Sequence, residues 1–164
     1  MKVFLAVLLT YMVQWMLGIP AAPSWLQWVL LPMVWIVAPP MRHRFDRIFF
    51  VGLALGLGWD LLFEPIVGPG MIAWSATALV VAWIIRKVGD HSARSWSILG
   101  AVGTVLVSGV AYLALLPLGA ASLPRLADLA VGAILTGLWC GLVAFVLAMN
   151  LPARVRRYRR SRLR

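Results

Sequence analysis

Six apolar segments follow one another along this chain and leave little room for anything else. They cover roughly Val3–Leu17, Trp25–Ala38, Ile48–Phe63, Gly70–Ile85, Trp96–Leu116 and Leu126–Met149. A helix needs about 20 apolar residues to cross a bilayer, and these runs lack the alternation typical of barrel strands. Because only helices and closed barrels can span lipid, we expect an all-α polytopic membrane protein. Residues 1–150 should form one compact bundle of six transmembrane helices, and residues 151–164 a basic cytoplasmic tail.

The overall composition excludes a soluble protein and several kinds of site. The chain is 63% hydrophobic and 12% charged, with a mean hydropathy of +0.94, far from the values of soluble domains. Its single cysteine, Cys140, excludes an internal disulfide and a cysteine metal cluster. A net charge of +10 would indicate nucleic acid in a soluble protein, but here the basic residues stand at segment ends. We therefore interpret the positive charge as a signal for the orientation of the helices in the membrane, and we expect no nucleic-acid partner.

The positive residues predict the orientation of the helices. If every segment crosses, fourteen of the fifteen lysines and arginines lie on one side, and Arg125 stands alone on the other. This basic face comprises Lys2, Arg42, Arg44, Arg47, Arg86, Lys87, Arg94, Arg154, Arg156, Arg157, Arg159, Arg160, Arg162 and Arg164. Positive residues accumulate on the cytoplasmic side, so both termini are expected there. We expect the tail to bind anionic lipids, with an acidic cytoplasmic partner as the alternative.

Two segments leave alternatives open. The second is short and contains Pro32, which is compatible with a re-entrant loop. Such a loop would place Arg42–Arg47 on the wrong side, so we expect this segment to cross. The first could be a signal peptide, because Lys2 precedes an apolar run. Pro23 and the five further segments favour a retained helix.

The most informative stretch is VGLALGLGWDLLFEPIVGPGMI, residues 51–72. Gly52, Gly56 and Asp60 are four apart, so they share one stripe of a helix, where glycines let another backbone approach closely. An intramembrane carboxylate is costly unless it is partnered or hydrated. Asp60 therefore either accepts hydrogen bonds from neighbouring helices or loop amides, or contacts a ligand, a proton or a partner. Glu64-Pro65 and Gly68-Pro69-Gly70 then break the helix and turn the chain back.

Small residues also recur late in the chain. Gly137 and Gly141 form a GxxxG pattern, and Gly100, Thr104 and Ser108 form another stripe. We expect these stripes to pack helices together within the monomer. The alternative is that one of them receives a helix of a partner protein.

The residue types needed for catalysis or metal binding do not come together. His43 and His91 fall in loops among arginines, so no imidazole faces a serine within the bilayer. The sequence around Asp60 is superficially similar to the motif of intramembrane aspartyl proteases, but no second intramembrane aspartate can share a proton with it. No histidine, cysteine and carboxylate set has a spacing suited to a metal. We therefore expect a non-enzyme without catalytic residues, metal or cofactor.

The run from Gly52 to Asp60, followed by Gly68-Pro-Gly70 and a helix ending in Arg86-Lys87, resembles the central segment of the MreD family. These are the small rod-shape-determining membrane proteins of bacteria. The specific match covers Val51–Lys87, and size, six-span layout and cytoplasmic termini are similar elsewhere. The resemblance implies a non-catalytic scaffold of the elongation (rod) complex in the bacterial inner membrane.

The same resemblance implies particular partners. The chain would bind MreC, a bitopic protein, directly within the membrane. Indirectly it would help couple cytoplasmic MreB filaments to a SEDS glycosyltransferase and a class B penicillin-binding protein, for peptidoglycan synthesis and cell shape. The family is also similar in structure to the six-helix substrate-binding subunits of energy-coupling-factor transporters. The alternative function is therefore that of a substrate-binding subunit for a vitamin-type molecule, but the outer loops offer few polar groups for such a pocket.

Overall fold

The structure is a computed structural model that describes residues 2–17, 29–37, 45–88, 92–119 and 125–162, and these residues contain helices and no strand. Its elements are α1 (Lys2–Leu17), the 3-10 turn η2 (Leu31–Met33), α2 (Val34–Val37), α3 (Phe45–Phe63), α4 (Pro69–Val88), α5 (Ala93–Leu115), the 3-10 turn η4 (Leu116–Leu118) and α6 (Leu126–Arg162). The all-α prediction is confirmed for this part of the chain. Five of the six predicted segments coincide with long helices.

Three of these helices are long and apolar enough to cross a membrane. Their candidate spans are Pro69–Lys87 in α4, Ala93–Leu118 from α5 into η4, and Leu126–Met149 in α6. The apolar parts of α1 and α3, Ala6–Met16 and Ile48–Phe63, are shorter. The chain is therefore a helical membrane protein.

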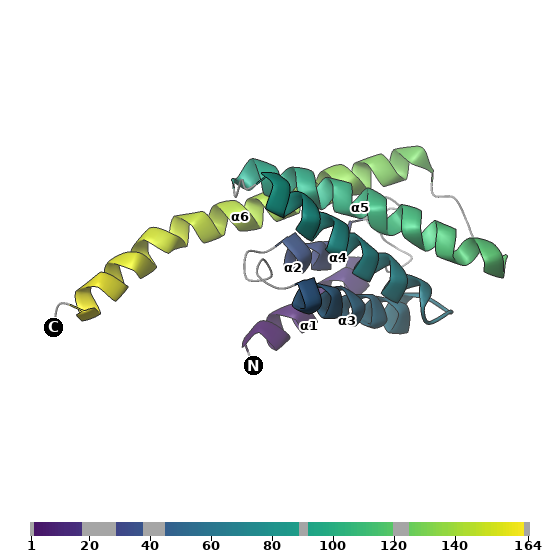
Figure 1. The fold of residues 1–164 in the computed structure, drawn as a ribbon, viewed down its shortest axis with the longest axis horizontal. Coiled ribbons are helices and arrows are strands. Elements are labelled where there is room, and N and C mark those ends of the chain that lie inside the picture. The colour runs from purple at the N-terminus through teal and green to yellow at the C-terminus, as the bar shows by residue number, and fades with distance from the viewer. Residues whose placement is uncertain (1, 18–28, 38–44, 89–91, 120–124, 163–164) are drawn as a thin grey trace.

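The helices run up and down in sequence (Figure 1). α3 packs on α4, α4 on α5, and α5 on α6. In Figure 1, α1, α3 and α5 run from left to right, whereas α4 and α6 run from right to left. The first residues of α1, α3 and α5 and the last residues of α4 and α6 therefore lie at one end of the bundle, which we call the basic end. We call the opposite end, where α3 turns into α4, the turn end.

The second predicted segment is not one continuous helix. Of Trp25–Ala38, residues 29–37 are described, and only Leu31–Val37 is helical, as η2 followed by α2. Pro32 lies in the first turn, where its missing N–H and its fixed φ are tolerated. Leu30 has φ −97° and ψ 81°, outside the helical region, so the helix does not extend back through it. The expected continuous helix is therefore wrong at this point.

Side chains from distant helices satisfy the backbone where this helix is missing. The amide of Leu30 donates to Oγ1 of Thr136 on α6 at 2.9 Å. The amide of Leu31 donates to Oε1 of Gln14 on α1 at 2.9 Å, and its carbonyl accepts from Nε1 of Trp139 at 3.2 Å. Gln14 and Thr136 are 1% and 0% exposed. Because hydrocarbon offers no hydrogen bonds, these three side chains allow an interrupted backbone inside the bundle.

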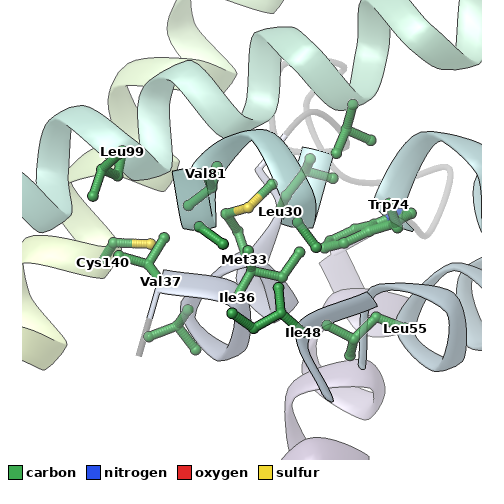
Figure 2. Packing of buried hydrophobic residues seen from close by; sticks show 14 of the residues in the cluster. Leu30, Met33, Ile36, Val37, Ile48, Leu55, Trp74, Val81, Leu99 and Cys140 are labelled. Atoms are coloured by element: carbon green, nitrogen blue, oxygen red, sulfur yellow. The ribbon is translucent and has the colours of Figure 1, made fainter. Parts of the chain in front are cut away.

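The interrupted segment forms the centre of the core. η2 contacts α1, α5 and α6, and α2 contacts α3, α4, α5 and α6. Met33 and Val37 are fully buried. Figure 2 shows them among Ile48 of α3, Val81 of α4 and Cys140 of α6. The longer helices thus pack around a short one, although that short helix is the element with the weakest sequence signal.

α6 does not end where its apolar segment ends. It is one helix from Leu126 to Arg162 and passes through Pro152. In Figure 1 its yellow last turns extend beyond the other helices. The expected boundary between the bundle and the tail at residue 150 is therefore a change of composition within one helix.

We expect Thr136→Val to destabilise the protein more than Thr136→Ser. Valine keeps the size but leaves the buried amide of Leu30 without an acceptor, which costs about 1–3 kcal/mol. Serine keeps the hydroxyl and loses one methyl group, worth about 0.8 kcal/mol. Thermal unfolding of the purified variants in detergent measures the difference. A serine variant as unstable as the valine variant would contradict the assigned role of the hydroxyl.

Candidate functional site

The carboxylate of Asp60 accepts hydrogen bonds from backbone amides of the following turn. It lies on the last turn of α3 and is 0% exposed. Oδ2 accepts from the amides of Gly68 at 2.7 Å and Met71 at 3.2 Å, and Oδ1 accepts from the amide of Gly70 at 2.8 Å. Hydrogen bonds from amides to a carboxylate are among the stronger ones in proteins. This geometry is that of a structural anchor between α3 and α4.

Asp60 completes the N-terminus of α4. The first amides of a helix have no partner within it, and negative charge is favoured there. In α4 the first residue is Pro69, which has no N–H; the next two amides bond to Asp60, and that of Ile72 donates to the carbonyl of Gly68 at 3.1 Å. Each of the first four positions of α4 is therefore satisfied without water.

The two glycines of this turn are required for different reasons. Gly68 has φ +128°, a backbone conformation that side chains disfavour. Gly70 has an ordinary φ, but a Cβ on it would lie 2.1 Å from Oδ1 of Asp60. A side chain at Gly70 would therefore displace the carboxylate.

The glycine stripe of α3 faces α4 of the same chain. A Cβ on Gly52 would lie 2.8 Å from the carbonyl oxygen of Trp74 and the Cα of Ser75. A Cβ on Gly56 would lie 2.5 Å from the carbonyl oxygen of Gly70 and the Cα of Met71. The two backbones thus touch over two turns, and this approach brings the start of α4 within reach of Asp60.

The late small residues join α5 to α6. A Cβ on Gly137 would lie 2.6 Å from the carbonyl oxygen of Ser97, and one on Gly141 would lie 2.0 Å from its Oγ. From the other side, a Cβ on Gly100 would lie 2.8 Å from Sγ of Cys140. Both glycine stripes are therefore occupied by helices of this chain.

Glu64 lies beside the carboxylate anchor at the turn end. It is exposed on one side, and with Trp59, Ile66 and Leu115 it lines a small hollow of about 30 Å³, which covers part of its side chain. Partial burial and the charge of Asp60 raise the pKa of Glu64, whereas hydrogen bonding with the side chain of Trp59 opposes this shift. The hollow has room for a group of about one or two heavy atoms.

The basic residues of the predicted cytoplasmic face are described unevenly. Arg42 and Arg44 lie outside the described residues, as do His43, Asp90 and His91. Arg47 stands in the first turn of α3, and Arg86 and Lys87 are exposed in the last turn of α4. Arg156, Arg157, Arg159 and Arg160 belong to the part of α6 that extends beyond the bundle. These positions all fall at the basic end.

The polar residues that bind the interrupted segment were not among the predicted site residues: Gln14, Thr136 and Trp139. A signal for them existed, since Gln14 and Thr136 are polar residues within apolar segments, and Pro32 disfavours helix in the residues before it. Within the described residues no group of three histidine, cysteine, aspartate or glutamate side chains is arranged to hold a metal ion.

No family model, no curated protein and no solved structure matches this chain. The resemblance to the MreD family therefore stays a prediction.

We expect Gly56→Ala to destabilise the bundle and Gly109→Ala to leave it unchanged or slightly more stable. The first methyl meets the backbone of α4 and forces the helices apart, at about 1–3 kcal/mol. The second meets nothing within 4 Å on α5, and alanine favours a helix over glycine. Melting temperatures in one detergent compare the two variants. Equal melting temperatures of the two variants would mean that the contact between α3 and α4 accommodates a methyl group at residue 56, which would contradict the close approach of the two backbones.

We expect Asp60→Leu to be more harmful than Asp60→Asn. Asparagine retains one oxygen acceptor, whereas leucine leaves three amides without partners, each at about 1–3 kcal/mol. Thermal unfolding gives the overall loss, and hydrogen exchange at Gly68, Gly70 and Met71 should be faster in the leucine variant. Equal loss in both variants would show that the charge of Asp60 matters more than its hydrogen bonds.

Proposed function

We propose that this chain is a non-catalytic membrane scaffold of the bacterial rod complex. It binds MreC within the membrane and helps couple MreB filaments to the SEDS glycosyltransferase and the class B penicillin-binding protein. The proposal is supported by the carboxylate of Asp60, whose two oxygens accept hydrogen bonds from backbone amides of the same chain. Because the oxygens of Asp60 are bonded within the chain, a partner protein would be bound by the lipid-facing surfaces of the helices.

We infer that all six segments cross the bilayer of the inner membrane. α1 and α3 have 16 and 19 residues, which corresponds to about 24 and 28 Å against a hydrocarbon core of about 30 Å. Because α1 and α3 run in the same direction (Figure 1), we infer a further crossing between them, and the described residues 29–37 of this stretch pack inside the bundle. The helix ends at the basic end then carry the positive residues, which makes this end, with both termini, cytoplasmic.

The partner surface follows from the packing. The glycine stripes of α3 and α6 are filled by α4 and α5, so they do not receive a helix of MreC. Apolar side chains exposed on the outer helices remain, such as Met12 on α1 and Leu142 on α6. Large exposed apolar patches mark lipid or protein contacts. At the basic end, the arginines and lysines bind anionic lipids.

The alternative is a substrate-binding subunit of a vitamin-type transporter, with a bundle similar to energy-coupling-factor subunits. One feature favours it, because interrupted helices in the bundle centre often mark transporter substrate sites. Here, however, the freed backbone groups of Leu30 and Leu31 bond to Thr136, Gln14 and Trp139, not to a cavity. The scaffold is therefore the better supported function.

A photocrosslinking amino acid at Met12 or Leu142 should form an adduct with co-expressed MreC in membranes. The same amino acid at Val81, which is 0% exposed, should form none and serves as the control. Adducts are detected by mass shift and antibody against MreC. Absence of MreC adducts at both exposed positions, with adducts to a transporter ATPase or coupling subunit, would favour the alternative.

A further inference from the structure

The hollow at the turn end combines a carboxylate with aromatic and apolar walls. Its lining includes Glu64, which is exposed, Trp59, which is half-buried, and Ala73 and Val107, which are buried. Trp59 packs against Trp74 at a centroid distance of 5.8 Å, and Trp74 also lines the hollow. In Figure 2, Trp74 lies at the edge of the core cluster. A carboxylate beside indole rings is suited to a cation, by charge and by cation–π attraction.

The charge at this end supports the same conclusion. By sequence, the turn end carries Asp60, Glu64 and Asp128 against the single positive charge of Arg125. Asp60 has its oxygens bonded to amides, so Glu64 is the carboxylate that faces the hollow. An occupant with a positive group is therefore favoured over an anionic one.

The surroundings of the opening point to lipid. Side chains exposed at this end include Ile66, Val67, Leu116 and Leu118, which are 36–57% exposed. They belong to the two connections that follow α3 and α5. The ends of helices that span a membrane lie where headgroups meet hydrocarbon. A group entering the hollow from this rim comes from a lipid headgroup already at high local concentration.

The volume decides which headgroup fits. About 30 Å³ accepts a group of one or two heavy atoms, such as a primary ammonium with its carbon. A trimethylammonium group with its attached carbon has five heavy atoms and lacks N–H donors for the carboxylate. Size and hydrogen bonding therefore select against choline.

We propose that this hollow binds the primary ammonium group of an ethanolamine lipid, with Glu64 accepting its N–H donors and Trp59 beside it. The phosphate and acyl chains of the lipid stay outside, against Ile66 and Leu116. The site is independent of the proposed role in the rod complex, since it requires only that the turn end lies at headgroup depth.

Native mass spectrometry of the full chain, released from nanodiscs of mixed lipids, tests the proposal. Phosphatidylethanolamine should be retained about five- to tenfold more than phosphatidylcholine. Retention should fall stepwise through the N-methyl and N,N-dimethyl lipids, because each methyl enlarges the group and removes a donor. Equal retention across the series overturns the proposal.

Two variants separate the site from general lipid binding. Glu64→Gln should abolish the preference for ethanolamine, whereas Asp128→Asn removes a carboxylate outside the lining of the hollow and should leave the preference as in the wild type. Glu64 is exposed, so Glu64→Gln should melt at the wild-type temperature, which shows that the fold is intact. A preference unchanged in Glu64→Gln, or lost equally in Asp128→Asn, would mean that the hollow does not bind the ammonium group.

Discussion

A backbone in hydrocarbon finds no water with which to form hydrogen bonds. At the two described places where the helical backbone of this bundle is interrupted, side chains supply the hydrogen bonds that water would otherwise make. At the start of α4 the replacement is the carboxylate of Asp60, which bonds three amides. Before η2 it is the set of Thr136, Gln14 and Trp139. Each of these groups would be costly in lipid by itself. Paired with a freed backbone group, each becomes part of the fold.

At the α3–α4 turn, the close packing of the two helix backbones and the hydrogen bonds of Asp60 depend on each other. Asp60 reaches the amides because Gly52 and Gly56 let the two backbones touch, and a Cβ on Gly70 would occupy the place of the carboxylate oxygen. The absence of side chains at these glycines is thus what makes room for the charged side chain of Asp60 in this interface. This explains why glycines and a carboxylate share one stripe of α3.

Much of the fold could be predicted from the sequence, but the centre of the bundle could not. Long apolar runs predicted α1, α3, α4 and α5 near their observed bounds and the start of α6, which however continues past Met149 to Arg162. The prolines and glycines after Phe63 predicted the turn. The interruption at Leu30 was not predicted, because Thr136, which bonds its amide, lies 106 residues further along the chain. The hydrogen bonds to Asp60 span only 8 to 11 residues, so local spacing indicated that such a carboxylate needed partners nearby.

By itself the sequence determined that this chain forms helices in a membrane, with glycine stripes and a carboxylate within an apolar segment, because apolar length and residue spacing are local properties. Only the tertiary structure decided which helix fills each stripe: α4 against Gly52 and Gly56, and α5 against Gly137 and Gly141. It also decided that a short interrupted helix, not a long one, occupies the centre. The physical reason is that a stripe or a freed amide specifies what kind of group must meet it, whereas the packing of all the helices together selects which group does.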